Sequence, residues 1–139
     1  MSNRQKEVGC MGRFVNPDNS AFQVILNSDI YVDKTELLAY TNKALNTDRA
    51  MICNSRPRRF GKSITANMLT AYYSRGCDSD AMFADLAISK TESYKKHLNK
   101  YDVIHLDIQW CSMDAGSTKQ TVTYINTNVI RELKEMYPD

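Results

Sequence analysis

The stretch from residue 50 to residue 73 most constrains the fold, because it joins an apolar run to an amphipathic helix through a basic loop. Residues 50–53 are apolar without alternation, which predicts a strand buried on both faces. The loop that follows ends in Gly61-Lys62-Ser63. From Lys62 onward, apolar residues recur at helical spacing and predict a helix that Gly76 stops near its end: Ile64, Met68, Leu69, Tyr72 and Tyr73. We expect Tyr72 and Tyr73 to be core side chains.

The rest of the chain continues the alternation of strands and helices. Asp33 predicts a helix start, with Glu36 reaching back as in a capping box. Residues 21–26 are apolar and fit a helix or a strand, and residues 103–108 predict a second buried strand. Residues 118–137 predict a last helix with one apolar face: Val122, Ile125, Val129, Ile130, Leu133 and Met136. The order predicts an α/β fold in which residues 50–53 and 103–108 are neighbouring parallel strands.

The loop before the helix has the parts that a triphosphate site needs. Backbone N–H groups at a helix N-terminus can hold phosphate oxygens. Gly61 lets the backbone approach the phosphates, Lys62 supplies positive charge, and Ser63 supplies a hydroxyl for Mg²⁺. The pattern predicts binding of ATP with Mg²⁺. The spacing alone leaves one alternative open, a basic turn that opens a helix, since Arg56 stands where the common loop pattern has its first glycine.

The loop as a whole resembles the variant P-loop of the AAA-ATPase-like family, in which Arg-Pro-Arg-Arg-Phe-Gly-Lys-Ser/Thr replaces the first glycine. Three further segments resemble motifs of that family, and they occur in the family's order. They are Tyr31-Val32-Asp33-Lys34-Thr35, then Met82-Phe83-x-x-Leu86-x-Ile88, then Tyr101-Asp102-Val103-Ile104. The four motifs cover residues 30–108, which is most of the chain.

The resemblance implies a P-loop NTPase-like parallel sheet with crossover helices, incomplete in this chain. Residues 1–29 would be a leader and turn, and residues 30–139 the N-terminal part of the ATPase domain. The implied nucleotide-binding residues are Arg56, Pro57, Arg58, Arg59, Phe60, Gly61, Lys62, Ser63 and Ile64, with Ser63 also on the metal. Asp33 and Lys34 either cap their helix or contact the nucleotide or its loop. Many members carry a C-terminal nuclease-like region of the PD-(D/E)XK type, which has no counterpart here.

No catalytic residue is assigned, because hydrolysis needs an acid at the end of a second strand to hold Mg²⁺. Asp107 is the one candidate, and a capping or loop role suits it better because Ile108, not a second acid, follows. The family's acidic strand would lie beyond residue 139, so we expect no ATP turnover by this chain. An unpaired sheet edge would favour self-association.

Charge and hydropathy limit the other partners. The net charge of +2 is too small to indicate nucleic acid, although three arginines in residues 56–59 keep that partner open. No stretch approaches the length of a membrane span, and no apolar leader precedes residue 20, so we expect a cytoplasmic protein without membrane contact. The alternatives to an ATP-binding module are a remnant that binds no nucleotide and a nucleic-acid-associated module of a nuclease-linked ATPase.

Overall fold

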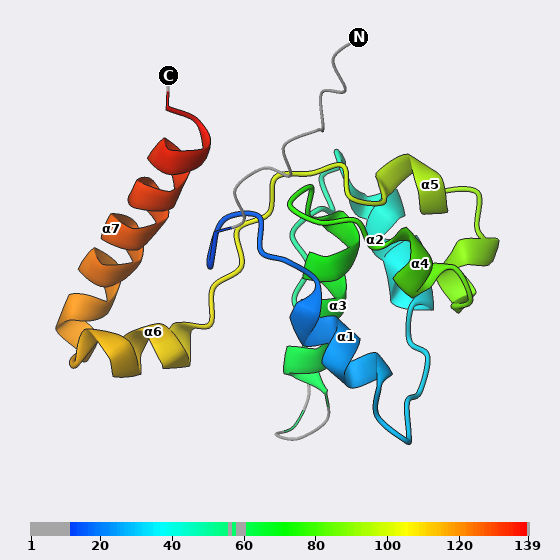
Figure 1. The fold of residues 1–139 in the computed structure, drawn as a ribbon, viewed down its shortest axis with the longest axis horizontal. Helices are drawn as coiled ribbons and strands as arrows, with labels where there is room; N and C mark the ends of the chain where they lie inside the picture. Colours follow the sequence, from blue (N-terminus) through cyan, green and yellow to red (C-terminus); the bar gives the residue numbers. More distant parts are fainter. Residues whose placement is uncertain (1–11, 56, 58–60, 139) are drawn as a thin grey trace, which may run out of the picture.

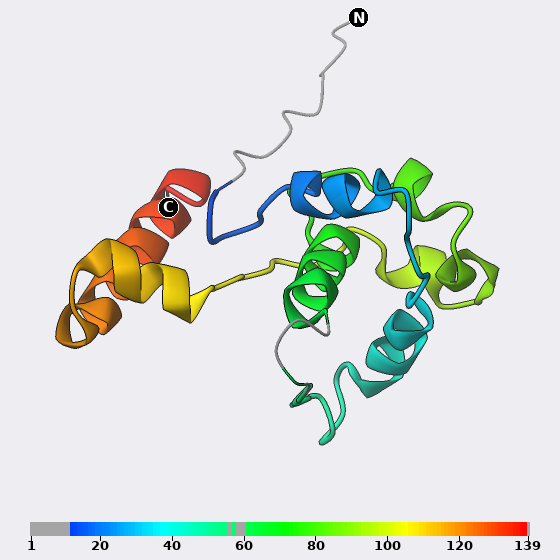
Figure 2. The ribbon, with the colours of Figure 1, turned by 90° about the horizontal axis from the view of Figure 1, so that it is seen from below.

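The structure is a computed structural model that describes residues 12–55, 57 and 61–138, and within them it is helical (Figure 1). The helices are α1 (Ser20–Leu26), α2 (Glu36–Ala44), α3 (Lys62–Tyr73), α4 (Asp80–Phe83), the 3-10 helix η1 (Ala87–Lys90), α5 (Tyr94–His97), α6 (Ile108–Ala115) and α7 (Thr118–Met136). Helices α1, α2, α4 and α5 gather around α3. Helices α6 and α7 pack on each other at one side of the molecule (Figures 1 and 2).

The predicted α/β fold with a parallel sheet is wrong, because the described residues contain no strand and only two isolated backbone bridges. Residues 50–53 belong to no helix or bridge, and Met51 is 97% exposed. Residues 103–105 pair antiparallel with residues 14–16. The Asn16 N–H donates to the Val103 carbonyl at 2.7 Å, and the His105 N–H donates to the Phe14 carbonyl at 2.9 Å. Buried backbone groups need a partner, and the N-terminal segment supplies it in place of residues 50–53.

The hydrophobic core surrounds Tyr72 of α3, which is fully buried. Its ring meets Phe83 edge-on with centroids 5.5 Å apart, and Phe83 stacks on Phe22 of α1 at 5.2 Å. The other buried members of the cluster come from α2, α3, η1 and the region of α5: Leu38, Met68, Ala71, Ile88, Tyr94 and Leu98. The prediction that Tyr72 is a core residue is confirmed, and Tyr73 is partly buried at the edge of the same cluster.

A polar network joins α2 to α3 within this core. The Tyr72 hydroxyl donates to the Tyr94 carbonyl at 2.9 Å and accepts a hydrogen bond from the Asn42 amide at 3.0 Å. The Tyr73 hydroxyl donates to the Asn42 side-chain oxygen at 2.7 Å, and burial raises the pKa of Tyr73 to about 12. Because each buried hydroxyl has a partner, the network fixes the rotation of α3 against α2.

Gly76 has a different role from the predicted one. Helix α3 ends at Tyr73, three residues earlier, and Ser74 already has extended backbone angles. A Cβ atom at position 76 would lie 2.2 Å from the carbonyl oxygen of Asn16. The glycine is needed because the backbone of the N-terminal segment approaches it closely.

The helix predicted for residues 118–137 is confirmed as α7, but its most buried long side chain is an acid. Glu132 is 5% exposed, whereas Val122 and Ile130 of the predicted apolar face are 66% and 50% exposed. The Glu132 carboxylate accepts hydrogen bonds from the backbone N–H groups of Arg13, Phe14 and Val15, each at 2.9 Å. Helix α7 therefore holds the N-terminal segment through a carboxylate, which satisfies N–H groups that an apolar side chain would leave unpaired.

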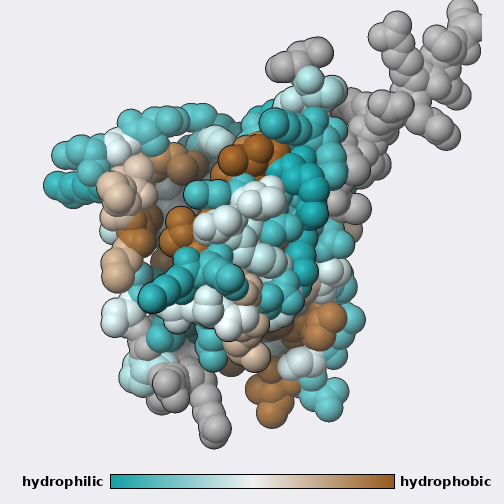
Figure 3. Space-filling view, turned by 90° about the vertical axis from the view of Figure 1, so that its left-hand side faces the viewer, coloured by the Kyte–Doolittle hydropathy of each residue, from teal (hydrophilic) through white to brown (hydrophobic). Residues whose placement is uncertain are grey.

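Figure 3 faces the side of the molecule on which α6 and α7 lie. The exposed apolar side chains on this side are separated by hydrophilic ones. Self-association was expected from the open edge of a sheet, and that reason falls away because the described residues form no sheet. Self-association itself stays a prediction.

We expect Glu132→Gln to lower the free energy of unfolding by about 2 kcal/mol. Hydrogen bonds to a charged acceptor contribute about 1.5–3 kcal/mol each, and the glutamine amide would face N–H donors with its own donors. Urea unfolding followed by circular dichroism measures the loss. Glu135→Gln is the matched control, because Glu135 lies on the same helix in an exposed pair with Arg131 (N–O distance 3.9 Å) and should change stability by less than about 0.5 kcal/mol. Equal stabilities of the two variants would contradict the role of Glu132.

Candidate functional site

Helix α3 begins at a glycine in the left-handed region. Gly61 has φ +86° and ψ 23° and occupies the N-cap position. Its carbonyl accepts hydrogen bonds from the Thr65 N–H at 2.9 Å and the Thr65 hydroxyl at 3.0 Å. Apart from its chain neighbours, no atom of the described residues lies within 4 Å of the place where a Cβ atom would stand, and the positive φ is what favours glycine here.

The first turn of α3 presents the predicted site residues to solvent. Lys62 and Ser63 are exposed, and Ile64 is 44% exposed. The first N–H groups of a helix have no partner within the helix, and no acidic residue stands in this first turn. The turn therefore combines N–H groups that have no hydrogen-bond partner among the described residues with one ammonium and one hydroxyl on a positively polarised helix end.

The rest of the predicted loop can be placed only in part. Arg56, Arg58, Arg59 and Phe60 lie outside the described residues, and their predicted contacts stay predictions. Pro57 is described and exposed.

A pocket of about 530 Å³ lies directly beside Gly61. Its walls come from α1, from residues 28–34 and from α3. The lining residues are Phe22, Ile25, Ser28, Ile30, Tyr31, Val32, Lys34, Gly61, Ile64, Thr65 and Met68. The pocket thus contains two residues predicted for the nucleotide site, Gly61 and Ile64, and places Lys34 with them.

Sequence reasoning missed the apolar part of this pocket. Residues 21–26 and 30–32 are apolar runs in the sequence. Nothing in their spacing indicates that they fold against the start of a helix that begins 30 residues later. The family-like motif predicts Asp33 and Lys34 as possible contacts to the nucleotide or its loop, and of these two Lys34 lines the pocket.

Asp33 works differently from the predicted capping box. Its carboxylate accepts hydrogen bonds from the Thr35 N–H at 2.8 Å, the Thr35 hydroxyl at 2.7 Å and the Ala87 N–H at 2.7 Å. The Thr35 hydroxyl in turn accepts from the Ile88 N–H at 3.1 Å. No side-chain bond caps α2 at Thr35. Asp33 and Thr35 therefore tie the segment that lines the pocket to η1.

The pKa of Asp33 reflects these bonds. Partial burial would raise it, but the hydrogen bonds from Thr35 and Ala87, and the nearby charge of Lys90, outweigh burial and hold the pKa below its ordinary value of 3.8. The charged form of Asp33 is therefore favoured in the folded protein.

Asp107 lies apart from this pocket. It occupies the N-cap position of α6, where its carboxylate accepts from the Trp110 N–H at 2.9 Å, so the predicted capping role is confirmed. It lines a second pocket of about 250 Å³ with Arg13, Phe14, His105 and Trp110, and the Arg13 guanidinium lies 3.3 Å from the centre of the Trp110 ring.

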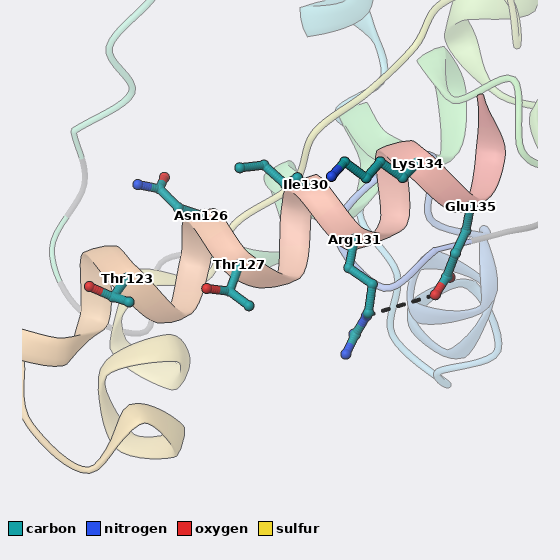
Figure 4. Close-up of a pocket in the computed structure, with 7 residues that line it drawn as sticks. All are labelled: Thr123, Asn126, Thr127, Ile130, Arg131, Lys134 and Glu135. Atoms are coloured by element: carbon teal, nitrogen blue, oxygen red, sulfur yellow. Dashed lines mark ion pairs between the residues drawn. The ribbon is translucent and has the colours of Figure 1, made fainter. Parts of the chain in front are cut away.

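A hollow of about 650 Å³ is on the surface of α7 (Figure 4). All seven lining residues belong to this one helix: Thr123, Asn126, Thr127, Ile130, Arg131, Lys134 and Glu135. A space bounded by a single helix is an open face of that helix. None of the residues that line this hollow belongs to the start of α3. Among the described residues no group of three metal-ligating side chains gathers, and no helix is long and apolar enough to cross a membrane.

We expect Asp33→Asn to lower the free energy of unfolding at pH 7 by about 1 kcal/mol, because one amide oxygen cannot replace two carboxylate oxygens as acceptors. A pKa lowered on folding adds stability above the unfolded pKa, and this stability is lost as the pH falls through the folded pKa. The difference between wild type and variant should therefore shrink below pH 3.8. Urea unfolding at several pH values measures it, with Asp29→Asn as a control in the same exposed segment. A gap that does not change with pH would contradict this account.

Sequence comparison assigns the chain to a family. The family AAA-ATPase_like, described as "Predicted AAA-ATPase", matches residues 19–139. No curated protein and no solved structure matches the chain. Because the family match covers most of the sequence, the resemblance seen in the four motifs is confirmed, and the protein belongs to the AAA-ATPase-like family.

Proposed function

We propose that the chain binds a nucleoside triphosphate, ATP, with Mg²⁺ at the start of α3. The observation that carries the proposal is Gly61 with φ +86°, which opens a twelve-residue helix whose first turn exposes Lys62 and Ser63. Phosphate oxygens accept hydrogen bonds from N–H groups at such a helix start, and the helix dipole favours their charge. Membership of a family described as predicted AAA-ATPases supports the same ligand.

Each side chain of this turn has one role in the proposed complex. The Lys62 ammonium neutralises the outer phosphates, and the Ser63 hydroxyl is a ligand for Mg²⁺, an ion that prefers oxygen ligands. The Mg²⁺ ion would neutralise charge between the phosphates. Lys34 of the neighbouring pocket adds a second positive charge on the same side as Gly61. The arginines of residues 56–59 would add further charge, as the variant P-loop implies.

We expect Lys62→Ala to weaken ATP binding at least tenfold, about 1.4 kcal/mol, since it removes the charge that faces the outer phosphates. Isothermal titration calorimetry with ATP and Mg²⁺ measures the two affinities. Lys119→Ala is the matched control, because Lys119 is an exposed lysine in the first turn of another helix, α7. Equal affinities of Lys62→Ala and wild type would refute the proposal and support the alternative of a remnant that binds no nucleotide.

We also expect ATP binding without turnover. None of the described residues that line the pocket beside Gly61 is acidic, and the carboxylate of Asp107 is engaged as the cap of α6. Phosphate release should stay at background, and Asp107→Asn should leave the affinity for ATP unchanged. Steady ATP hydrolysis that both Lys62→Ala and Asp107→Asn abolish would overturn this expectation.

A further inference from the structure

Helices α6 and α7 form a unit of their own at the edge of the molecule (Figures 1 and 2). They pack on each other, and the chain turns between them at Gly116 and Ser117. Gly116 has φ +79°, a backbone angle that glycine adopts readily. Two helices joined by a short turn with a glycine, the second of them with an outward face, are the arrangement of helix-turn-helix units that bind DNA.

One side of α7 is fixed to the rest of the protein, and this decides which side stays open. The hydroxyl oxygens of Thr121 and Ser112 of α6 lie 3.2 Å apart in a hydrogen bond. Glu132, about three helical turns later on the same side of α7, accepts hydrogen bonds from the N-terminal segment. Thr121 and Glu132 are both buried. The opposite side of the helix is therefore presented to solvent from Lys119 to Lys134.

The open side of α7 carries cations and neutral hydrogen-bonding groups (Figure 4). Arg131 and Glu135 lie at its border as an exposed ion pair, and Glu135 is the one exposed acid of the helix. The remaining exposed residues recur three and four positions apart and therefore share one face. They are Lys119, Thr123, Asn126, Thr127, Ile130 and Lys134. The face thus has three positive charges against one negative charge.

The other acids of this unit have hydrogen-bond partners of their own. Asp107 caps the start of α6. Asp114 accepts a hydrogen bond from the Tyr124 hydroxyl, and Glu132 accepts from the N-terminal segment. Positive charge is therefore concentrated on the open side of α7, although the whole chain has a net charge of only +2. A local excess of this kind fits a partner with repeated negative charges.

The spacing of the charges favours double-stranded DNA over other anionic partners. Lys119 and Lys134 lie about 22 Å apart along the helix at about 1.5 Å per residue, with neutral polar side chains between them. The major groove of DNA is about 12 Å wide, admits an α-helix, and offers base edges between two rows of phosphates. A lipid surface needs a broader apolar face than Ile130 supplies. A second copy packed on this face, parallel or antiparallel, would bring lysines of like charge together.

We propose that the open face of α7 lies in the major groove of double-stranded DNA. Lys119, Arg131 and Lys134 contact the phosphates. Thr123 and Asn126 face the base edges, where hydroxyl and amide groups form hydrogen bonds. The first turn of α7 adds to the attraction, because it holds no acidic residue and the helix dipole favours negative charge there. The inference does not depend on nucleotide binding at α3, and its test uses the protein without nucleotide.

Fluorescence anisotropy with a DNA duplex of about 20 base pairs and mixed sequence tests the proposal. Three phosphate contacts predict a slope of about −2.7 for log affinity against log salt concentration, so binding should weaken about fortyfold between about 50 and 200 mM salt. Lys119→Gln combined with Lys134→Gln should reduce the slope to about −0.9 and weaken binding at least tenfold at the lower salt concentration. Asn126→Asp, a nearly isosteric change at an exposed position, should weaken binding at least fivefold.

Lys96→Gln combined with Lys100→Gln is the matched control, because it removes the same charge from two exposed lysines outside α6 and α7. It should leave the affinity and the slope unchanged. Failure of wild type to bind the duplex, or equal losses in the control and in the α7 variants, would overturn the proposal. So would binding that the α7 variants leave unchanged, because the DNA would then lie elsewhere, for instance at the arginines of residues 56–59.

Two competitors separate the groove from charge alone. Duplex RNA has a major groove too narrow for side chains to read, and polyglutamate has negative charge without a groove. Each should bind at least fivefold more weakly than duplex DNA at the same salt concentration. Equal binding of duplex RNA would overturn the placement in the major groove. Equal binding of polyglutamate would overturn the assignment to DNA and identify an acidic protein segment as the partner.

Discussion

Burial of one face of α3 is the constraint on which the rest of the structure depends. Tyr72 and Met68 lie in the core, with Phe22 and Phe83 stacked beside them. The same helix begins at Gly61 and carries the candidate phosphate site in its first turn. Because core packing and the Asn42 network fix both the axis and the rotation of α3, they also fix the direction in which its free N–H groups point.

The segments that resemble family motifs support this helix from outside. Asp33 and Thr35 accept hydrogen bonds from Ala87 and Ile88, so the motif at residues 31–35 is bound directly to the motif at residues 82–88. Phe83 of the latter motif stacks on Phe22, which lines the pocket. The motif at residues 31–35 lines the pocket beside Gly61, and the motif at residues 82–88 holds that segment through these hydrogen bonds.

Local patterns predicted α3 and α7 closely, whereas α6 was not predicted and the predicted sheet is wrong. The start of α3 at Lys62 and nearly the whole length of α7 follow from helical spacing, capping residues and glycine chemistry, which act over a few residues. A parallel sheet depends on partners far apart in sequence. Residues 50–53 and 103–108 have strand-like composition, yet residues 103–105 pair with residues 14–16 instead. Glu132 and the apolar pocket were missed for the same reason, because each depends on a distant segment folding against a helix.

The proposed binding mode links the site to the stability of the fold. A nucleotide with its phosphates on the first turn of α3 would lie beside Gly61, which lines a pocket together with α1 and residues 28–34. These three parts are joined mainly through the core around Tyr72 and the bonds of Asp33 and Thr35. A ligand that binds only the folded arrangement stabilises it by mass action. Lys34 and Lys62 come from different segments, and Lys34 lines the pocket beside Gly61. The negative charge of the phosphates would attract both ammonium groups, so that binding would favour the folded arrangement of the segments that carry them.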